Sequence, residues 1–144
     1  MVIYADTSFL FSLYGNDVHS PRGVAWIAQC TVPIRINALT RYEFENALRF
    51  AEFRTAIKPG EAARFLAQFE AAITDGRIIV ETSNLVGVVA EARRISATRT
   101  LTGGHRGFDI LHVASALKLS ATEFLTFDVN QQQLAQAEGL HVPL

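Results

Sequence analysis

Apolar residues follow two alternating patterns along the chain: short apolar runs, and longer segments in which they recur at helical spacing. In residues 61–74, Ala62, Phe65, Leu66, Phe69 and Ile73 recur at intervals of three and four, which is typical of an amphipathic helix. The pattern predicts strands at residues 2–5, 32–37, 77–80, 124–127 and 140–142, helices at residues 7–14, 22–29, 40–53, 61–74, 84–98, 107–119 and 130–138, and a flexible loop at residues 102–104. This alternation predicts an α/β domain whose mainly parallel sheet is covered by helices on both faces.

The length and composition fit one compact domain over residues 1–144. Hydrophobic residues make up 49% of the 144 positions, which is enough for a sizeable core. There is no internal repeat, low-complexity stretch or Pro, Gly or Ser-rich linker. Cys30 is the only cysteine, which excludes an internal disulfide or a Cys-rich zinc site and suits a reducing, cytoplasmic setting. We expect neither a signal peptide nor a membrane helix, because the first residues lack a basic region and no apolar run approaches ~20 residues.

The charge balance argues against a protein that binds nucleic acid by bulk charge. The formal net charge is −1, from 13 Lys and Arg against 14 Asp and Glu, whereas phosphate-binding surfaces usually show a basic excess. Only two of the basic residues are lysines, and arginine is the better bidentate partner of a phosphate. The positions of the acids therefore matter more than the total charge.

Four acids fall where an α/β fold gathers its functional groups. Asp6 and Asp128 directly follow predicted strands, and Glu43 and Asp109 lie in the first turns of predicted helices. Ligands of such folds bind at the carboxyl ends of the strands. Each acid alone is also explained by helix capping and the helix dipole, and residues 40–43 read as a capping box of the T-x-x-E type.

Taken together, the four carboxylates predict a metal site. Their mutual repulsion at one sheet edge is tolerated when a divalent cation neutralises it, and an all-oxygen ligand set favours Mg²⁺ or Mn²⁺ over Zn²⁺. Such an ion suits phosphodiester hydrolysis. The four histidines are scattered. His112, one turn after Asp109, could face the site, but we expect it to be a packed or half-exposed helix residue. With four acids in the site, the other ten face 13 basic residues.

The ordered motifs resemble the PIN-domain family, and within it the small VapC-type ribonuclease toxins of toxin–antitoxin pairs. The matching segments are residues 2–8, 39–43, 108–116, 124–128 and 133–140. The resemblance implies a three-layer α/β/α sandwich and RNA cleavage that depends on Mg²⁺ or Mn²⁺. It also implies a homodimer, and inhibition by a cognate antitoxin whose C-terminal segment fills the active-site groove. The implied catalytic and metal-binding residues are Asp6, Glu43, Asp109 and Asp128, with Ser8 and Thr126 as polar groups that support the metal or position the substrate.

Neighbouring residues are assigned by their spacing from these acids. Arg41 and Arg106 lie two and three residues from proposed ligands and are candidate RNA contacts. Glu45 should point to nearly the opposite side of the helix from Glu43, and Asn130 is expected to cap the last helix. Arginines at positions 93, 94 and 99 are interpreted as a solvated helix face.

Two other functions stay open on the sequence. The acids could serve only as helix caps in a catalytically silent binding subunit. The chain could also be another Mg²⁺-dependent phosphohydrolase, although the D-x-D signature of haloacid-dehalogenase-like phosphatases would need an acid at Ser8.

Overall fold

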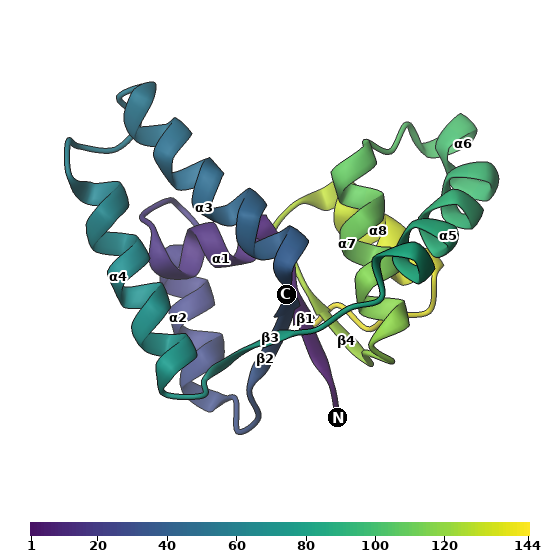
Figure 1. The fold of residues 1–144 in the computed structure, drawn as a ribbon, viewed down its shortest axis with the longest axis horizontal. Coiled ribbons are helices and arrows are strands. Elements are labelled where there is room, and N and C mark those ends of the chain that lie inside the picture. Colours follow the sequence, from purple (N-terminus) through teal and green to yellow (C-terminus); the bar gives the residue numbers. More distant parts are fainter.

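A sheet of four parallel strands divides the molecule into two groups of helices (Figure 1). The computed structural model describes residues 1–144. In the order β3-β2-β1-β4, the strands are β3 (Ile78–Glu81), β2 (Ile34–Asn37), β1 (Ile3–Ala5) and β4 (Glu123–Leu125). The predicted three-layer α/β/α architecture is therefore confirmed.

The two faces of the sheet carry separate hydrophobic cores. Side chains of successive strand residues point to opposite faces, so Ile3 and Ala5 enter one core and Tyr4 enters the other. On the first face lie α1 (Thr7–Tyr14), α2 (Ser20–Gln29), α3 (Ala38–Phe53) and α4 (Glu61–Thr74). On the second lie α5 (Leu85–Ile95), α7 (Gly107–Lys118) and α8 (Val129–Ala137), with η1 (Ser96–Thr100), which is π-helical, and α6 (Leu101–Gly103) continuing α5.

Helix α3 begins earlier than its sequence pattern suggests. The Asn37 side chain caps it by accepting a hydrogen bond from the Thr40 backbone N–H at 3.2 Å. Residues 40–43 are therefore not a capping box, and Glu43 lies in the second turn of α3 rather than the first. Asn37 prevails because it ends β2 and the helix follows it without a loop.

The C-terminal part of the chain departs from the predicted boundaries in four places. Strand β4 ends at Leu125, so two residues separate it from Asp128. Residues 140–142 form no strand but one bridge, between Glu123 and His141. Asp128, not Asn130, caps α8, because its carboxylate accepts the hydrogen bond from the Gln131 backbone N–H. The expected loop at residues 102–104 is helical up to Gly103. No helix is both long and apolar enough to span a membrane.

Candidate active site

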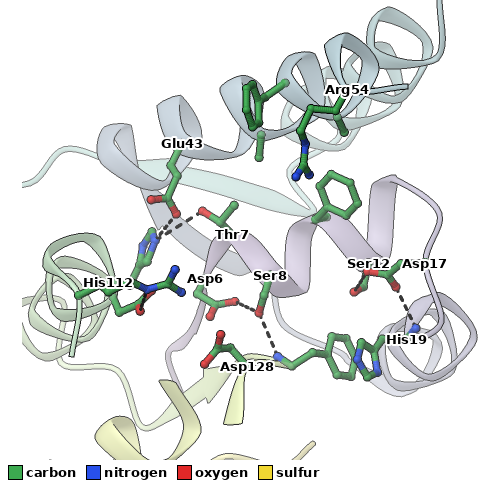
Figure 2. A pocket seen from close by; sticks show the side chains of 17 residues that line it. Asp6, Thr7, Ser8, Ser12, Asp17, His19, Glu43, Arg54, His112 and Asp128 are labelled. Carbon is green, nitrogen blue, oxygen red and sulfur yellow. Dashed lines mark hydrogen bonds and ion pairs between the residues drawn. The ribbon is translucent and has the colours of Figure 1, made fainter. Parts of the chain in front are cut away.

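A cleft of about 460 Å³ opens where β1 and β4 end and α1 and α3 begin (Figure 2). All four predicted acids are among its 17 lining residues. Asp6 and Glu43 come from the side of the first core, and Asp109 and Asp128 come from α7 and the start of α8 on the other side. The fold thus brings together carboxylates that are far apart in the sequence.

Asp6 is the most firmly held of the four acids. It is 3% exposed and caps α1, because its Oδ1 accepts hydrogen bonds from the Phe9 N–H at 2.9 Å and from the Ser8 hydroxyl at 2.7 Å. Its Oδ2 accepts a hydrogen bond from the Thr126 hydroxyl at 2.6 Å. Burial raises the pKa of Asp6, and nearby His112 and these hydrogen bonds offset part of that rise. The side chains of Ser8 and Thr126 therefore fix the direction of a buried carboxylate.

Glu43 is held by a buried histidine. Its Oε1 lies 2.7 Å from Nε2 of His112, which is 2% exposed. Because a carboxylate only accepts hydrogen bonds, Nε2 carries the proton. Burial acts to raise the pKa of Glu43, but His112, with smaller contributions from Thr7 and Arg106, outweighs it, so the pKa is lowered. His112 is therefore packed, as expected, and it also faces the cleft, which was the alternative suggested by its place one turn after Asp109.

A chain of buried polar side chains continues behind His112. Its Nδ1 lies 2.9 Å from the Thr40 hydroxyl, which lies 2.7 Å from the Tyr4 hydroxyl. Asn37 contacts Tyr4 and also donates from Nδ2 to the Ser115 hydroxyl at 2.7 Å. This chain joins β1, β2, α3 and α7. Buried polar groups are costly unless they are paired, so the chain fixes His112 and, through it, Glu43.

Asp128 and Asp109 are held more loosely. Oδ1 of Asp128 accepts a hydrogen bond from the Gln131 N–H at 2.9 Å and caps α8. Oδ2 of Asp109 accepts a long hydrogen bond of 3.3 Å from Arg106, whose side chain is 80% exposed. The second oxygen of each carboxylate has no hydrogen-bond partner. Oε2 of Glu43 is likewise without a hydrogen-bond partner, so three of the four acids have an oxygen that is free to accept a new ligand.

The donor set fits a hard divalent cation in kind, because carboxylate oxygens are the ligands that Mg²⁺ and Mn²⁺ prefer. No group of three or more His, Cys, Asp or Glu side chains is closely enough spaced here to hold a metal ion. Each acid is instead turned toward a protein donor.

The cleft extends well beyond the acids, into a region that the sequence did not indicate. Figure 2 shows Arg54 on one side and His19 on the other. This half of the cleft is lined by Phe11, Ser12, Asp17, His19, Phe50, Arg54 and Phe127.

Of the two predicted RNA-contacting arginines, only Arg106 lines the cleft. Arg41 forms ion pairs with Glu45 of α3 and Glu70 of α4. These two carboxylates hold its side chain outside the cleft, and its contact with RNA stays a prediction. Glu45 lies outside the cleft, as expected. Arg94 and Arg99 are not merely solvated, since both pair with Glu138.

Known proteins share both the family pattern and the fold. The family model of the PIN domain matches residues 3–137. The crystal structure of FitAcB from Neisseria gonorrhoeae is similar with a TM-score of 0.65 at 19% identity, covering 98% of this chain and 96% of that one. VapBC-1 from nontypeable Haemophilus influenzae has a TM-score of 0.62 at 15% identity, with 99% and 96% covered. PAE2754 from Pyrobaculum aerophilum has a TM-score of 0.61 at 17% identity, with 99% and 83% covered. No curated protein sequence matches this chain.

Proposed function

The chain belongs to the PIN domain family, and from that premise we propose that it is a metal-dependent endoribonuclease that hydrolyses phosphodiester bonds of RNA. The observation that carries this proposal is the convergence of Asp6, Glu43, Asp109 and Asp128 on one cleft at the carboxyl ends of β1 and β4. Nothing in helix capping requires four acids from four segments to share a cavity. Glu43 in particular caps no helix.

The four carboxylates would hold Mg²⁺, or Mn²⁺ in its place. When bound, such an ion supplies charge neutralisation for the phosphodiester and activation of water as a nucleophile. The protein supplies the positioning: Ser8 and Thr126 aim Asp6, and His112 aims Glu43. Exposed Arg106, at the rim of the cleft, would contact a phosphate of the RNA.

We further propose that the chain acts in the cytoplasm as the toxin of a toxin–antitoxin pair. The full-length likeness to the proteins in the FitAcB and VapBC-1 structures supports this role. The partners would be an RNA substrate, a cognate antitoxin and a second copy of the chain in a homodimer. The antitoxin would inhibit by occupying the same cleft.

One alternative has an observation in its favour. Asp6 and Asp128 do cap helices, and the acids are not yet grouped as metal ligands. A catalytically silent subunit that only binds partners would have the same caps. It would not need the buried pairing of Glu43 with His112.

The substitution Asp6→Asn separates the two functions. We expect the parent to cleave single-stranded RNA with Mg²⁺ or Mn²⁺ and to stop when EDTA is added. Asp6→Asn should lower the rate about a hundredfold or more, because metal-ion catalysis contributes several kcal/mol to the barrier. The matched control is Asp75→Asn, which changes an exposed acid paired with Arg77 outside the cleft.

Circular dichroism should show that both variants keep the fold. Mg²⁺ should also raise the melting temperature of the parent more than that of Asp6→Asn, because an ion that binds only the folded state stabilises it. Equal cleavage by the parent and Asp6→Asn would contradict the assignment. No cleavage by the parent, together with no thermal response to millimolar Mg²⁺, would favour the silent subunit.

A further inference from the structure

The end of the cleft remote from Glu43 and His112 combines exposed aromatic rings with arginines that have no acidic partner. Eight of the eleven arginines form ion pairs with carboxylates. The other three are Arg22, Arg54 and Arg93. Of these, Arg54 lines the remote end of the cleft, and Arg22 lies outside the lining but next to Phe127, which lines it. A free guanidinium is available for a phosphate, whereas one paired with a carboxylate must first give up its partner.

Each of these two arginines lies over an aromatic ring that lines the cleft. The guanidinium carbon of Arg54 is 4.9 Å from the ring centroid of Phe50, and that of Arg22 is 6.0 Å from the ring centroid of Phe127. Distances of this size are typical of cation–π contacts. The contacts keep each charge beside a ring instead of leaving it to move freely in solvent.

The rings themselves present faces for stacking. Phe50 is 51% exposed, and Phe53 stacks behind it with centroids 6.0 Å apart. On the opposite side, the exposed ring of His19 lies flat on Phe127, with centroids 4.7 Å apart and an angle of 5° between the planes. One face of His19 is thus covered by Phe127 and the other is left for a ligand. Figure 2 shows Arg54 and His19 on facing sides of this space.

The one acid at this end does not oppose an anionic ligand strongly. Asp17 accepts hydrogen bonds from the Ser12 hydroxyl at 2.8 Å and from the His19 backbone N–H at 2.9 Å. Both of its oxygens are therefore turned toward α1 and the start of α2. The groups left to meet a ligand are two guanidinium groups and two aromatic surfaces.

We propose that this end of the cleft is a subsite for unpaired nucleotides of single-stranded RNA. Arg54 and Arg22 bind phosphates, and the rings of Phe50 and of His19 on Phe127 stack nucleobases. The assignment rests on the proposed ribonuclease function and adds to it the residues that hold the RNA beyond the four acids. Bases in a duplex are already stacked on one another and cannot offer their faces, whereas unpaired bases can.

The test measures binding of a short fluorescein-labelled single-stranded RNA by anisotropy, in EDTA and over a range of salt concentrations. For single strands, each phosphate contact contributes about 0.7 to the slope of log affinity against log salt. Arg54→Ala and Arg22→Ala should each reduce that slope by about 0.7. The matched control is Arg93→Ala, which removes an unpaired, exposed arginine on α5 outside the cleft and should leave the slope unchanged.

Substitutions of the rings separate stacking from charge. Phe50→Leu keeps an apolar side chain but removes the aromatic face, and should weaken binding about fivefold or more with the same salt slope. Phe50→Trp should restore the parental affinity. His19→Ala should behave like Phe50→Leu. The same strand annealed to its complement should bind more weakly than the single strand, and Phe50→Leu should not affect it.

Unchanged salt slopes for both arginine variants would overturn the subsite. Equal weakening by Phe50→Leu and Phe50→Trp would overturn the stacking. Equal or tighter binding of the duplex would overturn the choice of single strands. These failures are distinct from failure of the proposed function. If Asp6-dependent cleavage persists without the predicted binding pattern, only the subsite is wrong. If binding follows the predicted pattern but the parent cleaves nothing, only the ribonuclease function is wrong.

Discussion

On each side of the sheet, one of the two acids caps a helix and the other does not. Asp6 and Asp128 accept backbone N–H groups at helix starts, so the fold itself gives a reason for their positions. Glu43 and Asp109 accept only side-chain donors, the buried His112 and the exposed Arg106. The difference teaches that the capping acids are ambiguous evidence for function. The stronger evidence is Glu43, because a buried histidine and four further polar side chains are arranged behind an acid that caps nothing.

Substitution of Asp6, the most firmly held acid, should have the largest effect on stability. Asp6→Ala removes the cap of α1 and leaves the buried Thr126 hydroxyl without its acceptor, so the free energy of unfolding should fall by about 3 kcal/mol. Asp6→Asn should cost far less, because Asn also caps helices and because it removes a buried charge. Urea denaturation of both variants measures the difference. Equal losses would show that the charge, not the hydrogen bonds, holds this acid.

The pairing of Glu43 with His112 should make the second largest contribution to stability. A double-mutant cycle with Glu43→Gln and His112→Gln should give a coupling energy of about 2 kcal/mol, as expected for a hydrogen bond to a charged group in a partly buried site. For cleavage, His112→Gln should retain more activity than His112→Asn, because the Gln amide reaches the position of Nε2 beside Glu43. A coupling energy near zero would show that His112 does not hold Glu43, and Glu43 would then be no stronger evidence for function than the capping acids.

The cap made by Asp128 should matter less than that made by Asp6. Asp128→Ala should lower the free energy of unfolding by about 1 kcal/mol, the usual value of an N-cap, and Asp128→Asn should have almost no effect. Thermal or urea unfolding gives both numbers. A loss as large as that of Asp6→Ala would mean that Asp128 supports more than the first turn of α8.

The contact between Arg106 and Asp109 should have the smallest effect on stability. Arg106→Ala should change the free energy of unfolding by no more than about 0.5 kcal/mol, because exposed ion pairs are screened by water and salt. Arg106→Ala should nevertheless raise the KM for RNA cleavage, which steady-state kinetics would detect. An unchanged KM would leave Arg106 as a partner of Asp109 only.

Much of the fold follows from local signals in the sequence. Helix α4 carries a regular apolar stripe and has the predicted bounds of residues 61–74, and the alternation of strands and helices identified the layers. Boundaries failed where two residues competed for one role: Asn37 and Thr40 are both good caps, and only the junction with β2 decides between them. The apolar run at residues 140–142 makes a single bridge, and its composition alone could not show how little of it pairs.

The candidate site also contains residues that the sequence indicated and residues that it did not. The four acids were identifiable because strand ends and helix starts can be located in the sequence; their role as metal ligands stays a prediction. The spacing of His112 from Asp109 suggested that it could face the site, but its partners Glu43 and Thr40 lie 69 and 72 residues away, and helical periodicity carries no information about such contacts. Arg54 and Phe50 were missed because they lie near the end of α3, and only the packing of α1 beside that helix makes them cleft residues.

The division of the sheet into two cores has a consequence for cooperativity. Local opening of a protein proceeds in sub-global units, and the two cores here lie on opposite faces of strands of only three or four residues. Asp6 and Glu43 belong to one side and Asp109 and Asp128 to the other. A ligand held by all four acids would therefore have to be released before the two sides separate. Native-state hydrogen exchange would register its binding as slower exchange in α5, which contributes no residue to the cleft, and as a merging of two unfolding units into one.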